Sequence, residues 1–304
     1  MSRTLNGIAP SDAQTRRPKF LVSGKPGVGK TWVSMDFPNA YYIDVEGGAT
    51  QPHYREKLNA SNASYFGVEQ GSQEFDCVIE EVITLATVKH DRKTLIIDSI
   101  TKLYNIAAGL AEERVGNEFG RHMKEAQKPL KRLLRWLDKL DMNVILICHE
   151  KDKWGLRKNG ESGVIDQTFD CWDKLEYELD FYIQVHKEGP RYRGLIRKSR
   201  LLEFPQGDSI IWSYEEFAKI YGRDSLEADT QAIVLATSEQ IQTLKSLVAQ
   251  FNSIEDDPKN QISEKKEKAW LTRANADTFE EFTNDQITAL IEMMTTKLSK
   301  KAVA

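Results

Sequence analysis

One stretch of the chain, residues 24–31, constrains its fold more than any other. Its letters, GKPGVGKT, fit the phosphate-loop pattern G-x-x-x-x-G-K-[ST] without a gap. Gly24, Gly27 and Gly29 permit backbone conformations that a side chain would block. Successive N–H groups can then turn inward and form an anion site at the start of a helix. The stretch therefore predicts a site for the phosphates of a nucleotide.

The residues on both sides of the loop support this interpretation. The run Lys19–Ser23 predicts the strand that precedes a phosphate loop, and Thr31–Met35 can open the helix that follows. A Gly-rich surface turn is the alternative, which this order of elements disfavours. Lys30 is expected to reach the β- and γ-phosphates of ATP, and Thr31 to bind Mg²⁺. The predicted nucleotide-binding residues are Gly24, Lys25, Pro26, Gly27, Val28, Gly29, Lys30, Thr31 and Trp32.

The composition is that of a globular protein without a global attraction to nucleic acids. Of the 304 residues, 40% are hydrophobic and 29% charged, and the net charge is −4, so nucleic-acid binding would need local basic patches. The scattered cysteines Cys77, Cys148 and Cys171 lack metal-ligand spacing and predict reduced thiols. No apolar run has spanning length, and the N-terminus lacks a signal-peptide core. We therefore expect a cytoplasmic protein without membrane contact.

Apolar runs that alternate with helical patterns predict an α/β fold with a mostly parallel central sheet. Residues 94–98 and 143–147 are strands of consecutive apolar residues, as expected for strands covered on both faces. Residues 151–172 are polar and contain glycine, which predicts an irregular loop. A turn at 188–190 between two β-rich runs predicts a β-hairpin.

The chain ends in a predicted small all-helical domain. Its helical stripes follow capping boxes, in which Thr237 pairs with Gln240 and Thr283 with Gln286. The first residues are polar and lack periodicity, which predicts a flexible arm. The predicted parts are an N-terminal arm at 1–17, an ATPase core at 18–222, a linker at 223–236 and a helical C-terminal domain at 237–304.

Two acidic residues at strand ends indicate that the predicted phosphate site also hydrolyses its nucleotide. Asp98 closes an apolar strand and is expected to orient Mg²⁺ through its water shell. Glu46 follows the strand after the phosphate-loop helix, so we expect it beside the loop of the first strand, as a general base. His149 ends the next apolar strand and could contact the γ-phosphate. The alternatives are an ordinary turn residue for Glu46 and a structural histidine for His149.

These motifs resemble those of RecA-core recombinases. Residues 42–47 (YIDVEG) resemble their strand-and-glutamate motif, and residues 95–100 (LIIDSI) their second nucleotide motif, with its serine after the aspartate. Residues 18–222 resemble the RecA-like phage ATPases of single-strand annealing and recombination. The resemblance implies a RecA-like P-loop NTPase core, ATP hydrolysis coupled to single-stranded DNA binding, and a homo-oligomer. It makes Glu46 the catalytic glutamate, whereas His149 stands where RecA has a glutamine that senses the γ-phosphate.

The resemblance also assigns roles to two basic patches. RecA cores place a DNA-binding loop after the sensor strand, where basic residues with an aromatic can contact phosphates and stack a base. Lys198 and Arg200 resemble the Lys-x-Arg element of hexameric replicative helicases, which acts in trans on a neighbour's ATP. A solvated loop and a surface strand end are the alternatives. The implied DNA-binding residues are Lys151, Lys153, Trp154, Arg157 and Lys158.

The leading hypothesis is a Mg²⁺-dependent, DNA-stimulated ATPase of phage recombination or replication that promotes annealing or strand pairing, as a ring or a filament. An ATP-switched assembly or loader protein with slow or no hydrolysis is the alternative. A small-molecule kinase is disfavoured by Glu46 and by the lack of an Arg-rich lid. The C-terminal helices could dock a single-stranded-DNA-binding protein, contact DNA or only solubilise the assembly. The predicted catalytic residues are Glu46, Lys30, His149, Lys198 and Arg200.

Overall fold

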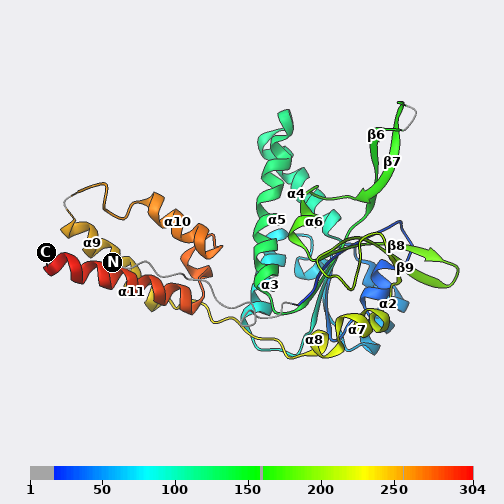
Figure 1. Ribbon diagram of the computed structural model, residues 1–304, viewed down its shortest axis with the longest axis horizontal. Coiled ribbons are helices and arrows are strands. Elements are labelled where there is room, and N and C mark those ends of the chain that lie inside the picture. The colour runs from blue at the N-terminus through cyan, green and yellow to red at the C-terminus, as the bar shows by residue number, and fades with distance from the viewer. Residues whose placement is uncertain (1–16, 158–159, 256, 304) are drawn as a thin grey trace. The chain divides into compact units, whose positions relative to one another are not determined.

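The computed structural model describes residues 17–157, 160–255 and 257–303 (Figure 1). Lys158 and the predicted arm up to residue 16 lie outside the described residues. The described chain divides into two compact units, and the predicted domain boundaries stay a prediction. The first unit contains the described residues of Met1–Val78, His90–Leu130 and Asp141–Thr230, and the second those of Ile79–Lys89, Lys131–Leu140 and Gln231–Ala304.

The first unit is built on an eight-stranded sheet of order β10-β9-β8-β1-β5-β4-β2-β3. The strands from β8 to β3 in this order pair in parallel. Strand β9 pairs antiparallel with both β8 and β10. All residues of β1, β4 and β5 are buried, as their apolar runs predict. The bounds are β1 Lys19–Ser23, β2 Ala40–Asp44, β3 Ser64–Phe66, β4 Thr94–Asp98, β5 Asn143–Ile147, β8 Phe181–Glu188, β9 Arg191–Ser199 and β10 Ser209–Ile211.

Helices connect the strands and make up most of the second unit. Side chains cap several of them: the Ser99 hydroxyl accepts from the Lys102 N–H at the start of α4. The helices are α1 Lys30–Ser34, α2 Pro52–Ala60, α3 Phe75–Thr87, α4 Ile100–Val115, α5 Arg121–Lys139, α6 Leu175–Glu178, α7 Tyr214–Tyr221, α8 Arg223–Glu227, α9 Ser238–Ile254, α10 Glu264–Ala274 and α11 Asn284–Val303. No helix in the described ranges is both long and apolar enough to cross a bilayer.

The second unit packs α9, α10 and α11 around its own apolar core. The predicted capping box of Thr237 and Gln240 is confirmed, and Thr283 and Gln286 exchange the same pair of hydrogen bonds. This core contains Ile241, Leu244, Phe251, Phe282, Ile287 and Met294, among others.

The predicted fold class is confirmed as an α/β core with a mostly parallel sheet, a hairpin of β8 and β9, and a helical C-terminal region. The prediction of an irregular loop at 151–172 is wrong. Two antiparallel strands, β6 Glu150–Leu156 and β7 Ser162–Phe169, form a hairpin that projects from the core (Figure 1). Neither strand has a consistently buried face, so no apolar alternation announces them in the sequence. The predicted linker likewise begins with a short helix, α8.

Aromatic rings form the centre of the core on one face of the sheet. Phe217 of α7 is fully buried, with its ring 4.9 Å from that of Phe20 on β1 and 4.8 Å from that of Phe204. Phe20 in turn stacks on Phe181 of β8 at 5.1 Å. These contacts attach the last part of the unit to the strand that carries the phosphate loop.

We expect Phe217→Ala to lower the free energy of unfolding by about 3–5 kcal/mol, because it removes a buried ring and leaves a cavity. Urea titration followed by circular dichroism measures this. Leu202→Ala, at a side chain that is 93% exposed, is the control and should change stability by less than about 0.5 kcal/mol. If Phe217→Ala lowered the free energy of unfolding as little as Leu202→Ala does, the packing of Phe217 described above would be contradicted.

Candidate active site

The register of four parallel strands places the ends of the strands on one line. Successive partners across the sheet are Asp44, Asp98 and Ile147, the last residues of β2, β4 and β5, and Val22, the last but one residue of β1. Glu46, His149 and Gly24 each lie two residues beyond this line. Because the carboxyl ends of parallel strands meet at one edge of the sheet, these residues gather there although they are far apart in the chain.

The prediction that Glu46 lies next to the loop of the first strand is wrong in one respect. Strands β5 and β4 stand between β1 and β2, so Glu46 is carried by a strand that does not pair with β1. Its backbone instead continues the pairing of β2 with β4, since the N–H groups of Val45 and Glu46 both donate to the Asp98 carbonyl, at 2.7 and 3.3 Å. Glu46 therefore faces the end of β4.

The phosphate loop has the predicted backbone shape. Gly24 and Gly29 have φ angles of 151° and 92°, in the left-handed region. A Cβ on Gly24 would lie 2.4 Å from the Val185 carbonyl oxygen, and one on Gly29 2.2 Å from the Tyr192 ring. Both sites thus require glycine. The Tyr192 ring, on β9, is a wall of the loop that the sequence reasoning missed.

The amino group of Lys30 bends back over this loop. It donates to the carbonyl oxygens of Gly24 and Lys25, at 2.8 and 3.0 Å. Burial lowers the pKa of Lys30, against the opposing charges of Asp98 and Glu46. The amino group therefore lies at the mouth of the loop, where phosphate oxygens can replace the two carbonyls as its partners.

Other predicted binding residues divide between the loop and a neighbouring helix. Lys25, Pro26 and Gly27 are exposed at the tip of the loop. Trp32 instead packs against α2, where the Lys57 ammonium lies 4.1 Å from its ring centre and the Tyr54 ring meets it edge to face. The assignment of Trp32 to nucleotide binding stays a prediction.

Thr31 and Asp98 meet beside the loop, as predicted for a Mg²⁺ site. The Thr31 hydroxyl donates to Asp98 Oδ2 at 2.5 Å, and the Tyr42 hydroxyl donates to the same oxygen at 3.0 Å. Burial raises the pKa of Asp98 to about 6, against the hydrogen bond from Thr31. A hydroxyl and a carboxylate next to an anion-binding loop are the hard oxygen ligands that fit Mg²⁺.

Glu46, Ser99 and His149 form a second cluster next to Asp98. Glu46 Oε1 accepts a hydrogen bond from the Ser99 hydroxyl at 2.5 Å and lies 2.5 Å from His149 Nε2. Ser99 Oγ is 3.3 Å from the same ring nitrogen. Burial raises the pKa of Glu46, but the hydrogen bonds from Ser99 and His149 outweigh it, so that the net pKa is lowered. Glu46 is therefore an ionised carboxylate at neutral pH.

Asp44 shapes the turn that presents Glu46, a role that the sequence reasoning missed. Its buried carboxylate accepts from the N–H groups of Gly47, Gly48 and Ala49, at 2.7, 3.1 and 2.9 Å. The signal was available, since an aspartate at the end of a strand and three residues before Gly-Gly is typical of a side chain that bonds the backbone of a turn.

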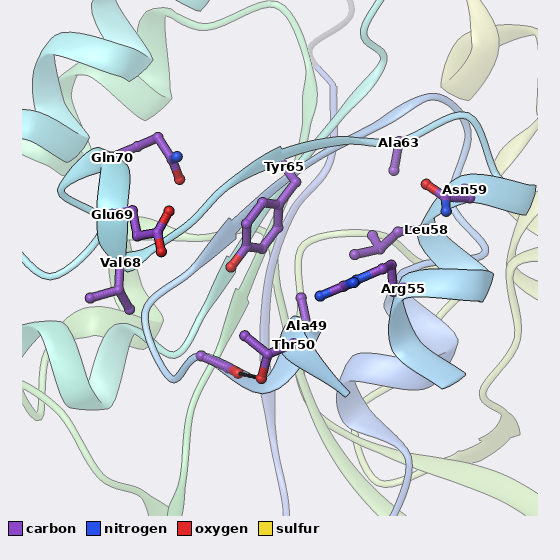
Figure 2. Close-up of a pocket in the computed structure, with 11 residues that line it drawn as sticks. Ala49, Thr50, Arg55, Leu58, Asn59, Ala63, Tyr65, Val68, Glu69 and Gln70 are labelled. Atoms are coloured by element: carbon purple, nitrogen blue, oxygen red, sulfur yellow. Dashed lines mark hydrogen bonds between the residues drawn. The ribbon is translucent and has the colours of Figure 1, made fainter. Parts of the chain in front are cut away.

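A cavity of about 620 Å³ opens beside this turn (Figure 2). It lies between α2 and the short 3₁₀ segment Val68–Gln70, with Tyr65 of β3 between them. The Tyr65 hydroxyl also bonds Asp44, at 3.3 Å. None of the predicted catalytic residues belongs to the described lining of this cavity, which is therefore separate from the phosphate loop.

Lys198 and Arg200 lie away from the loop of their own chain. Lys198 donates to the carbonyls of Glu176 and Leu179, and Arg200 bonds the Asp180 carboxylate at 3.0 Å. Lys198 pairs with Tyr182 near the start of β8, whereas the phosphate loop follows the opposite end of the parallel strands. Their predicted action on a neighbouring subunit's ATP stays a prediction.

Comparison with known proteins assigns the family. A family model described as "AAA domain" matches residues 16–210. The chain belongs to this family. The AAA domain covers the phosphate loop, Glu46, Asp98 and His149. No curated protein sequence matches the chain.

Two solved structures are similar to part of the chain. The RadB recombinase is 18% identical, with a TM-score of 0.41, over 63% of this chain and 84% of that one. The flagellar accessory protein FlaH from Methanocaldococcus jannaschii is 12% identical, with a TM-score of 0.35, over 64% of this chain and 84% of that one.

The buried Asp98 should make the stability of the nucleotide-free protein depend on pH. Between its ordinary pKa of 3.8 and about 6, the folded protein retains a proton that the unfolded chain releases. The free energy of unfolding therefore falls as the pH rises through this window, by up to about 3 kcal/mol. We expect Asp98→Asn to be more stable than the parent at pH 7 and to lose this advantage near pH 4. Urea titrations at both pH values measure it, and equal stability at pH 7 would contradict the burial of the charge.

Proposed function

We propose that this protein is a Mg²⁺-dependent ATPase of phage recombination or replication that single-stranded DNA stimulates. The observation that carries the proposal is the position of Glu46, an ionised carboxylate that Ser99 and His149 hold at the same sheet edge as the phosphate loop. A phosphate loop alone fits any nucleotide-binding protein. A carboxylate held at this edge supports a general base that orients and deprotonates the attacking water.

The surrounding residues support phosphoryl transfer to water. The N–H groups of the loop and the Lys30 ammonium would stabilise the negative charge on the phosphates. Thr31 would bind Mg²⁺ and Asp98 would orient its water ligands, and the ion would neutralise charge between the phosphates. His149, through its contact with Glu46, would report whether the γ-phosphate is present.

Two exposed projections support binding of single-stranded DNA. On the β6–β7 hairpin, Trp154 is 68% exposed and Lys153 and Arg157 are exposed beside it. On the connection between α4 and α5, Phe119 is 98% exposed with a φ of 52°, and Arg121 follows it. The connected ends of α4 and α5 and the strands of the β6–β7 hairpin extend to the same side in Figure 1. Aromatic rings with nearby cations suit stacked bases and their phosphates.

The further parts of the proposal concern assembly. The protein would act as a homo-oligomer, ring or filament, in the cytoplasm of the host and would promote annealing or strand pairing. Lys198 and Arg200 would complete a neighbour's site after exchanging their present partners on and around α6. The C-terminal helices would provide a surface for a single-stranded-DNA-binding protein.

Glu46→Gln should remove the base without removing the loop. We expect kcat for ATP hydrolysis to fall by about 10²–10⁴-fold while the dissociation constant for ATP changes little. A phosphate-release assay and a fluorescent-nucleotide titration measure the two quantities. Glu69→Gln, at an exposed acid on the neighbouring 3₁₀ segment, is the control and should keep full turnover. Unchanged turnover in Glu46→Gln would favour the ATP-switched assembly protein.

Trp154→Ala and Phe119→Ala should each weaken binding of an oligo-dT strand by about 1–3 kcal/mol, because each removes a stacking ring. Tyr177→Ala, at a 66% exposed ring on α6, is the control. Fluorescence anisotropy at several salt concentrations measures affinity, and the slope against salt should stay the same in both variants. Wild-type affinity in both variants would exclude these two projections as the DNA surface.

A further inference from the structure

The hydroxyl of Thr101 occupies an unusual place at the base of the β6–β7 hairpin. Thr101 lies in the first turn of α4, and its side chain is 1% exposed. Its Oγ1 accepts from the His149 N–H at 2.9 Å and donates to the Asp170 carbonyl at 2.7 Å. The hydroxyl thus bridges the two chain segments that enter and leave the hairpin.

This bridge replaces a bond of the β ladder. The register pairs Glu150 with Phe169, so His149 and Asp170 are the next partners toward the sheet. An antiparallel hydrogen-bonded pair exchanges two N–H···O bonds. Here the Asp170 N–H donates to the His149 carbonyl at 2.9 Å, but the reciprocal bond is made through Thr101. The hairpin base is therefore attached to α4 as well as to itself.

The same helix start leads directly to the catalytic cluster. Ser99, two residues before Thr101, donates to Glu46 and lies 3.3 Å from His149 Nε2. Thr101 holds the backbone of His149, whereas Ser99 and Glu46 contact its ring. His149 belongs to the hairpin base and its ring contacts Glu46, so a shift of the base would change the distance between His149 and Glu46. The Thr101 hydroxyl would carry a shift of the Asp170 segment to His149.

We propose that Thr101 is a positioning residue that couples the Glu46–His149 pair to the β6–β7 hairpin. Occupation of the hairpin by single-stranded DNA would move the His149 backbone through this hydroxyl and set Glu46 for hydrolysis. In the reverse direction, nucleotide at the loop would order the hairpin base. The inference rests on the proposed function and adds the path by which DNA reaches the catalytic base.

The hydroxyl can be removed with little change of shape. Thr101→Val keeps the volume and loses the bridge, whereas Thr101→Ser keeps the hydroxyl. In the full-length protein, we expect oligo-dT to stimulate ATP hydrolysis by wild type and by Thr101→Ser. In Thr101→Val, the kcat measured with oligo-dT should be lower by at least about tenfold, with little change in KM for ATP. Thr94→Val is the matched control, because Thr94 is also fully buried and hydrogen-bonded but lies at the opposite end of β4.

Hydrogen exchange tests the bridge without hydrolysis. A non-hydrolysable ATP analogue with Mg²⁺ should slow amide exchange in peptides that contain His149 and Asp170, in wild type and Thr101→Ser but not in Thr101→Val. If Thr101→Val does not fold by circular dichroism, Thr101→Ala, which leaves room for a water, takes its place and should show a partial loss of both effects.

The outcomes separate the inference from the function on which it rests. Full stimulation in Thr101→Val, or equal losses in Thr101→Ser and Thr101→Val, would overturn the role of the hydroxyl. Wild-type protein without any DNA stimulation would instead refute the proposed function. In that case the hydrogen-exchange data still test the Thr101 bridge. Protection by the ATP analogue that is present in wild type and lost in Thr101→Val supports the bridge. No protection by the analogue in wild type overturns it.

Discussion

The register of the central parallel strands is the constraint on which the site depends. Pairing of β2 with β4, β4 with β5 and β5 with β1 places Asp44, Asp98, Ile147 and Val22 on one line. Glu46, His149 and the first glycine of the phosphate loop, Gly24, each lie two residues beyond that line. A slip of one residue in any pair would turn the side chains to the other face and separate the acid from the loop. The buried apolar strands hold this register, so the core is directly responsible for the geometry of the site.

The site concentrates charges that are only partly balanced without nucleotide. Asp98 is buried with a raised pKa, and the Lys30 ammonium, whose pKa burial lowers, donates to the backbone carbonyls of Gly24 and Lys25. Phosphates and Mg²⁺ together would give Lys30 an anionic partner and Asp98 a cationic one. Glu46, by contrast, is already held by two side chains. In the proposed function, the site would therefore gain most from binding MgATP, because Glu46 is already held before the nucleotide binds.

Local motifs made part of this site predictable. The phosphate loop and Asp98 are encoded in short runs whose backbone shape follows from glycine and from apolar strand patterns. The position of Glu46 was only half predictable, because strand order decides that β4 and not β1 lies beside it. The β6–β7 hairpin and the exposure of Phe119 left no periodic signal. The Thr101 bridge joins residues 48 apart in the chain, and such contacts depend on register, which a single sequence does not show.

We propose that nucleic acid bound at the two projections with exposed aromatic rings changes the chemistry at Glu46, at the carboxyl edge of the sheet. The most direct measurement is steady-state ATP hydrolysis by the full-length protein with Mg²⁺, with and without single-stranded oligo-dT. We expect Mg²⁺-dependent turnover that rises when the oligonucleotide is added. Turnover that is the same with and without DNA, at concentrations where binding is demonstrated, would contradict the proposal.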